Sequence, residues 1–185
     1  MNNSKLEAKN LTGSVWKAEG YVFAYDIIKQ EFWTSALDKE ENSKWVMGGV
    51  HSDFDKENGF RSNGYSFIVA GHNFAGGGKS IEHVITGLMG AGIKAVIAES
   101  FSRLQFRNAI NYGLPFITCK GIEAIASTGD ELEVDPISGQ IKNLTTGQEI
   151  QAAPVAPFVA EVAESGGLIS YIQNVIKEGK VDELR

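Results

Sequence analysis

The middle of the chain alternates short apolar runs with amphipathic stretches. Three apolar runs, at 65–71, 94–98 and 114–119, have the length and composition of buried strands. Between them, 81–89 and 102–112 read as helices, and the first places its apolar residues three and four positions apart, on one face. An order of strand, helix, strand, helix, strand requires right-handed crossovers, so the pattern predicts a parallel core sheet flanked by helices.

The N-terminal third is less regular. Two bursts of apolar residues, at 14–16 and 21–25, are predicted to form short strands on either side of Gly20. From 29 to 64 the periodicity is weak and polar clusters are frequent. We expect this stretch to be an irregular, partly helical excursion over the surface.

The C-terminal third changes character again. Strict alternation over 131–135, a Pro-Ile-Ser-Gly turn and a second run at 140–144 predict a β-hairpin. A helix is expected over 159–177, interrupted at Gly166 and Gly167. The charged residues 178–185 are expected to form a solvated tail.

Composition agrees with a single globular domain over residues 1–185. The chain has a mass of 20.0 kDa, with 43% hydrophobic and 22% charged residues. No apolar run approaches the ~18 residues of a membrane span, and the polar N-terminus lacks the features of a signal peptide, so a cytoplasmic protein is expected. A net charge of −6 and a pI near 5.1 argue against nucleic acid as a partner.

Cysteine usage limits the chemistry of the chain. Its one cysteine, Cys119, excludes an internal disulfide and an all-cysteine zinc site. An iron–sulfur cluster is normally held by three or four thiolates, so this chain cannot hold one alone. His51 and His72 lack a spaced partner, and no metal ligand is assigned.

A glycine-rich loop connects the first strand of the core to the first helix. Gly76, Gly77 and Gly78 let several backbone N–H groups and the positive end of a helix surround one small space, where an anion can bind. Lys79 adds a positive charge, and Ser80 adds a hydroxyl that can also cap the helix. The alternative is a tight turn that serves only the packing of strand on helix.

The same loop partly matches a nucleotide-binding P-loop. Gly78–Ser80 correspond to the end of the pattern G-x-x-x-x-G-K-S, but Asn73 stands where the first glycine belongs. The later strands lead to Glu99 and Cys119 rather than to an aspartate that would hold magnesium. These departures disfavour a phosphoryl-transfer enzyme.

Several runs, in this order and spacing, resemble the small subunits of the aconitase and 3-isopropylmalate dehydratase family. The likeness extends from about residue 20 to residue 173. The runs concerned are 68–74, the glycines with Glu82 and His83, 95–101, 107–115, 129–135 and 164–169. The resemblance implies an α/β fold, the layered swivelling domain of that family, with a parallel core sheet, flanking helices and additional β-hairpin strands.

The resemblance also implies an activity. It identifies the chain as the small subunit of a hydro-lyase or isomerase that is inactive without its large subunit, which carries a 4Fe–4S cluster. The expected substrate is a small hydroxy-dicarboxylate or tricarboxylate, and the expected partners include neither nucleic acid nor a membrane. No cofactor is expected on this chain itself. The alternative is a non-catalytic paralogue of the same fold that binds small organic anions or acts as an interaction subunit.

The loop departs from the family pattern G-x-G-S-S-R-E-H. Anchoring the comparison on the Glu-His pair places Lys79 at the first serine, Ser80 at the second and Ile81 at the arginine. One extra residue before the glycines also allows Lys79 to align with the second serine and Ser80 with the arginine. Both alignments lose the arginine, whose planar group grips a carboxylate with two hydrogen bonds, whereas lysine offers a compact charge. The resemblance leaves Ser80 as the candidate catalytic base and Lys79 as the candidate carboxylate anchor.

Two further residues are candidates for binding substrate. Asp26 matches the family's aspartate near the active site, although an isolated aspartate at this point would be read as a turn or capping residue. Arg107 can contact a carboxylate or the partner subunit, or can be a solvated helix residue. The predicted substrate-binding set is therefore Gly76, Gly77, Gly78, Lys79, Asp26 and Arg107.

Overall fold

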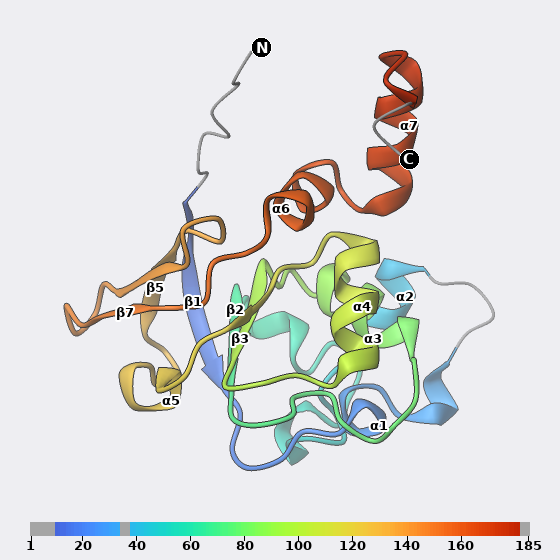
Figure 1. The fold of residues 1–185 in the computed structure, drawn as a ribbon. Coiled ribbons are helices and arrows are strands. Elements are labelled where there is room, and N and C mark those ends of the chain that lie inside the picture. Colours follow the sequence, from blue (N-terminus) through green and yellow to red (C-terminus); the bar gives the residue numbers. More distant parts are fainter. Residues whose placement is uncertain (1–9, 34–37, 182–185) are drawn as a thin grey trace.

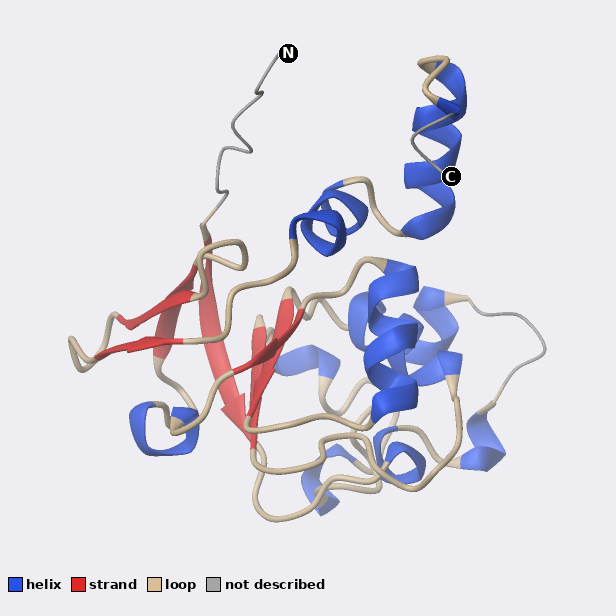
Figure 2. Ribbon diagram, in the orientation of Figure 1, coloured by secondary structure: helices blue, strands red, loops and turns tan. Residues whose placement is uncertain are grey.

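A computed structural model of the chain describes residues 10–33 and 38–181. Its centre is one seven-stranded sheet, seen in red in Figure 2. The strands are β1 (Leu11–Lys17), β2 (Phe67–Ala70), β3 (Ala95–Ala98), β4 (Phe116–Thr118), β5 (Glu131–Val134), β6 (Gln140–Asn143) and β7 (Glu149–Gln151). Their order in the sheet is β4-β3-β2-β1-β5-β6-β7. The first four are parallel and the last three antiparallel, so the predicted parallel core and added hairpin are confirmed.

Strand β1 joins the two halves of the sheet. Its C-terminal part pairs in parallel with β2, where Val15 lies opposite Phe67. Its N-terminal part pairs antiparallel with β5, where Leu11 lies opposite Val134. One seven-residue strand thus extends a parallel α/β sheet into the hairpin.

Helices cover both faces of this sheet. They are α1 (Ala24–Ile27), α2 (Lys39–Ser43), α3 (Glu82–Gly90), α4 (Arg103–Tyr112), α5 (Ile122–Ile125), α6 (Pro157–Glu164) and α7 (Leu168–Lys177). Figure 1 shows α2, α3 and α4 grouped on one side, while α5 lies beside the hairpin strands. No helix among the described residues is long and apolar enough to cross a membrane.

The strands bury side chains on both faces, which gives two hydrophobic cores. On β2, Ile68 and Ala70 belong to the core under α3 and α4, whereas Phe67 and Val69 belong to the core that includes Ile122 of α5. The alternation follows from the two-residue repeat of a strand. Because every residue of β2 is buried, its sequence is a continuous apolar run rather than an alternating one.

The prediction of a strand at 21–25 is wrong. Phe23 makes a single bridge to Gly76, and the chain then turns into α1. The Asp26 N–H donates to the carbonyl of Phe23 at 3.0 Å, which closes the turn. The apolar burst therefore reflects burial of Val22 and Ala24, not membership of the sheet.

The segment 29–64 is built from short helices. Besides α2, it contains 3₁₀ turns at Gln30–Phe32, Ser52–Phe54 and Arg61–Asn63. It also contributes to the core, since Val46, Met47, Phe54 and Phe60 are buried. Of the tail expected at 178–185, residues 178–181 are exposed and 182–185 lie outside the described part.

Two glycines allow the backbones of α3 and α2 to approach each other closely. A Cβ on Gly87 would lie 2.6 Å from Cγ1 of Val46, three residues beyond α2, and one on Gly90 would overlap the carbonyl oxygen of Lys39, in α2. The second contact is with backbone, which cannot move aside as a flexible side chain can. The close approach therefore requires glycine at position 90.

We predict that Gly90→Ala destabilises the protein by ~1–3 kcal/mol, because the added methyl forces the two helices apart. Helix propensity alone predicts the opposite sign, a gain of ~1 kcal/mol for Gly→Ala within a helix. Urea unfolding monitored by circular dichroism measures the difference. Asn111→Ala, at an exposed position of α4, is the control and is expected to leave stability nearly unchanged. Equal or greater stability of Gly90→Ala would contradict the packing described above.

Candidate active site in the glycine loop

The glycine loop, residues 71–81, connects the carboxyl end of β2 to α3. This edge of a parallel sheet is where α/β proteins commonly bind ligands. Gly76 holds the loop against the segment that enters α1: its N–H donates to the carbonyl of Val22 at 3.2 Å, and its carbonyl accepts from the N–H of Ala24 at 2.9 Å. The loop and the start of α1 are therefore neighbours, although some fifty residues separate them along the chain.

The backbone of the loop takes uncommon conformations. Asn73, Ala75, Gly77 and Gly78 have positive φ angles of 54°, 56°, 105° and 76°. Positive φ is uncommon for residues other than glycine, and its small energetic cost persists where the surrounding structure imposes it. At position 77 a side chain is disfavoured by φ, and a Cβ would also make a tight contact of 3.1 Å with Cε2 of Tyr25.

Beyond Gly76 the loop is open to solvent. Gly77, Gly78, Lys79 and Ser80 are exposed, and their N–H groups donate to no acceptor in the described part of the chain. The nine-residue helix α3 follows directly, so its positive end adds to the same region. Free N–H groups, a helix N-terminus and an ammonium group together favour a bound anion.

The first residue of α3, Glu82, is held by a hydrogen bond. Its carboxylate accepts from the hydroxyl of Tyr112, on α4, at 2.8 Å. Burial, followed by this acceptor and its charge, raises the pKa of Tyr112 to about 12. The pair links the start of α3 to the end of α4.

The sequence suggests that Ser80 can cap α3, but in the structure it does not. The N-cap is Ile81, which makes no side-chain hydrogen bond. The Ser80 hydroxyl donates instead to Oδ1 of Asn108 at 3.1 Å, because α4 presents this amide within reach of the loop. On the same helix, Nε2 of Gln105 donates to the carbonyl of Lys79 at 3.2 Å.

Lys79 lies beside a row of aromatic rings. Its Nζ is 5.7 Å from the centroid of the Tyr25 ring, a cation–π distance. Tyr25 stacks on Trp33 at 6.3 Å, and Trp33 stacks on His83 at 5.9 Å. This row of rings joins α1, the end of the first 3₁₀ turn and α3, and its first ring, Tyr25, lies next to the Lys79 ammonium group. Neither Tyr25 nor Trp33 belongs to the substrate-binding set predicted from the sequence.

The other two candidate residues differ in their relation to the loop. Asp26 lies on α1, the helix that adjoins the loop, but within the described residues its half-buried side chain makes no hydrogen bond or ion pair with the loop. Its backbone is tied down, since its carbonyl accepts from the N–H of Gly49 at 2.9 Å. Arg107 is exposed on α4, and within the described residues its side chain makes no hydrogen bond or ion pair with the loop.

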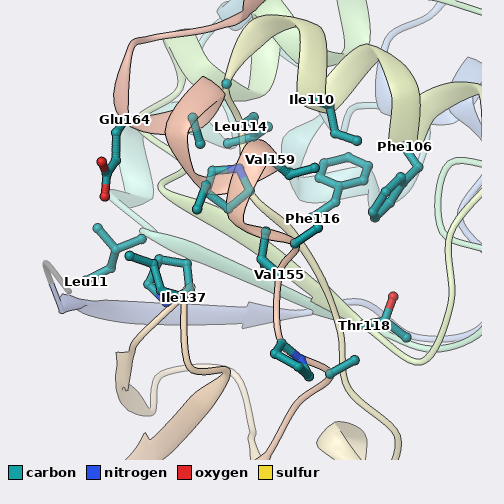
Figure 3. Close-up of a pocket in the computed structure, with 18 of the residues that line it drawn as sticks. Leu11, Phe106, Ile110, Leu114, Phe116, Thr118, Ile137, Val155, Val159 and Glu164 are labelled. Atoms are coloured by element: carbon teal, nitrogen blue, oxygen red, sulfur yellow. The ribbon is translucent and has the colours of Figure 1, made fainter. Parts of the chain in front are cut away.

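Two hollows on the described surface lie away from the glycine loop. One is an apolar groove of about 540 Å³ between α4 and α6, with Phe106, Ile110 and Val159 in its wall (Figure 3). The other, of about 740 Å³, is lined by polar residues around His51 and Tyr65. No residue of the loop lines either hollow. These two hollows are therefore separate from the candidate site, whose residues 77–80 are exposed.

The residues of this chain do not fit an iron–sulfur cluster. Cys119, at the end of β4, is buried, and burial together with the charge of Glu99 raises the pKa of its thiol to about 11. No group of three His, Cys, Asp or Glu side chains that could hold a metal occurs within 10–33 and 38–181.

Comparison with known proteins identifies relatives that belong to one family. Residues 9–120 match the aconitase C-terminal domain family. The small subunit of isopropylmalate/citramalate isomerase from Methanocaldococcus jannaschii is 42% identical over 170 residues, which cover 92% of this chain and 98% of that protein. The 3-isopropylmalate dehydratase small subunit from Methanosarcina acetivorans is 43% identical over 138 residues, or 75% of this chain and 82% of that one.

A solved structure agrees with these relatives. The crystal structure of 3-isopropylmalate dehydratase from Methanocaldococcus jannaschii aligns with a TM-score of 0.79 and 30% identity, covering 93% of this chain and 99% of that one. The expected layered α/β fold of the swivelling domain is thereby confirmed. The chain belongs to the aconitase C-terminal domain family, among the small subunits of 3-isopropylmalate dehydratase.

Proposed function

We propose that the chain is the small subunit of an iron–sulfur hydro-lyase that dehydrates or isomerises a small hydroxy-dicarboxylate. The observation that carries this proposal is the open glycine loop, which offers an ammonium group, free N–H groups and a hydroxyl on one exposed surface. An exposed loop cannot exclude water by itself, and excluding water strengthens each of these contacts. We infer that a second subunit closes over the loop and completes the site.

We also propose that the cluster belongs to that second subunit. The single buried thiol of this chain does not fit a cluster, and the relatives are themselves named small subunits. In this division the chain binds and orients the substrate, while the departure of the hydroxyl group depends on the partner.

Within the loop, Lys79 and the neighbouring N–H groups are proposed to hold a substrate carboxylate. Ser80 is proposed to act as the base after its hydroxyl has released its own proton to solvent, a state that Lys79 and the positive end of α3 favour. The alkoxide then accepts the proton from the adjacent carbon, so that a carbon–carbon double bond forms as water leaves. The family's arginine is missing, and the residue at its place in the anchored alignment, Ile81, is buried in the core. The positive charge of the loop therefore has to come from Lys79.

Asp26 and Arg107 are proposed to complete the substrate-binding set. Asp26 lies beside the loop on α1, where it can orient a substrate hydroxyl. Arg107 is exposed on α4, where it can contact a second carboxylate once the partner is bound, or the partner itself. Both assignments rest on the resemblance and on placement beside the loop or on α4.

The proposal is tested by isolating the tagged chain from its native cells and assaying it alone and with the co-purified large subunit. We expect turnover of 3-isopropylmalate or citramalate in the complex and none from either subunit alone. The absorbance of the unsaturated product reports the reaction. A complex that binds these acids without turning them over would instead support a non-catalytic, anion-binding paralogue, and failure to recover a cluster-bearing partner would count against the proposal.

Lys79→Met and Ser80→Ala should have different kinetic effects in the reconstituted complex. An anchoring charge acts in both ground and transition states, so Lys79→Met is expected to raise KM by at least ~10-fold with a smaller effect on kcat. A base acts when the proton moves, so Ser80→Ala is expected to lower kcat by ~10²–10⁴-fold.

The matched control for the charge is Lys142→Met, in the exposed hairpin pair with Glu149, which should leave both constants unchanged. If both loop variants kept wild-type kinetics, the catalytic roles of Lys79 and Ser80 would have to be abandoned.

Cys119 is expected to be unreactive in the folded chain. Its thiol is buried and has a pKa of about 11, so it stays protonated, and therefore weakly nucleophilic, throughout the neutral range. Labelling with a disulfide reagent at pH 8 should be negligible in buffer and should reach one thiol per chain in guanidinium. Rapid labelling of the native chain would show that this thiol is accessible and would reopen its use as a metal ligand.

A further inference from the structure

Helix α4 carries two amide side chains on its buried face. Gln105 is fully buried and Asn108 is 6% exposed, next to the fully buried Ala109. Burying an amide costs free energy unless its polar atoms are hydrogen-bonded, so leucine at either position would be the simpler choice for packing alone. The hydrogen-bond partners of these two amides therefore indicate the role of the amides.

Their partners are the two chemically active residues of the glycine loop. Gln105 donates to the Lys79 carbonyl at 3.2 Å, and Asn108 accepts from the Ser80 hydroxyl at 3.1 Å. The two amides are joined to each other, since Nδ2 of Asn108 lies 3.4 Å from Oε1 of Gln105. Two buried groups on a regular helix thus hold two consecutive residues that are themselves exposed.

We propose that Asn108 is a positioning residue for the Ser80 hydroxyl, and that Gln105 supports it by fixing the Lys79 carbonyl. This inference rests on the function proposed above for Ser80. Donation to Asn108 selects one rotamer of an otherwise exposed serine and turns its hydrogen toward α4. The Ser80 oxygen is thereby fixed on the open side of the loop, where it can accept a substrate proton once the hydroxyl has released its own proton to solvent.

An amide suits this role because it is uncharged and so does not repel a substrate carboxylate. It fixes the position of the Ser80 side chain, and its own NH₂ group is held by Gln105, which limits rotation of the Asn108 side chain. Misplacement of a reacting group by about 1 Å can lower the rate by ~10²-fold. Loss of the Asn108 acceptor should therefore lower kcat and affect KM little.

The test is a double-mutant cycle between Asn108→Leu and Ser80→Ala in the reconstituted complex. We expect Asn108→Leu to lower kcat by at least ~10-fold with KM within about twofold of wild type. We expect Ser80→Ala/Asn108→Leu to be no slower than Ser80→Ala alone, because Asn108 acts through Ser80.

Asn111→Ala is the matched control, since Asn111 is an exposed amide on the same helix, and it should leave kcat unchanged. Melting temperature and affinity for the large subunit are measured for each variant. If Asn108→Leu does not fold, Asn108→Ala replaces it, and a low kcat with KM within about twofold of wild type then supports the proposal.

The possible failures can be told apart. Full activity of Ser80→Ala would remove the proposed base, and with it the function assigned to the loop. Loss of kcat in Ser80→Ala together with unchanged kcat in Asn108→Leu would overturn the positioning role alone. A double variant slowed by the full product of the two single effects would also overturn it, because such additivity is the signature of a general structural contribution.

Discussion

The backbone pairing of Gly76 with the segment entering α1 is the constraint on which the rest of the site depends. Two hydrogen bonds, to Val22 and from Ala24, draw the loop after β2 against a segment that lies far from it in the sequence. From that point the chain must return to start α3 over the sheet, and it does so through residues with positive φ. The residues from Gly77 to Ser80 are the exposed part of this connection to α3, and they do not belong to either hydrophobic core.

Contacts from two sides hold the exposed stretch in place. On one side, Tyr25 of α1 lies against Gly77 and under the ammonium group of Lys79. On the other side, α4 supplies hydrogen bonds to Lys79 and Ser80 from buried amides. Each support belongs to an element anchored in the core, so the loop can be open to solvent and still hold one geometry. Such an arrangement is suited to a site shared between two subunits.

The sequence predicted those parts of the structure that burial determines. The order β2, α3, β3, α4, β4 follows from apolar runs and spacing, because strands and helices that face two cores must be apolar at regular intervals. The glycine loop was identified from residue type and position alone. The short burst at 21–25 was misassigned because an aromatic, apolar segment is typical of strands, whereas here it packs beside the loop and starts α1.

Contacts between distant residues could not be predicted in the same way. Ser80 has the residue type and position of a helix cap, and nothing local indicates that its hydroxyl is bonded to Asn108, 28 positions away. A signal did exist in α4, where Gln105 and Asn108 occupy positions that the helix buries with Ala109. Polar residues on a buried face imply polar partners. The identity of those partners, and the row from Tyr25 to His83, required the fold.

The most direct test of the central claim, that the glycine loop faces substrate only once a partner completes the site, is amide hydrogen exchange of residues 71–81. It should be measured for the chain alone, for the complex with its large subunit, and for that complex saturated with a hydroxy-dicarboxylate. The N–H groups of Gly77 to Ser80 have no acceptor in the described chain, so we predict fast exchange in the isolated chain, with or without the acid, and marked protection in the complex with the acid. Exchange that stays fast in the complex with bound acid would contradict it.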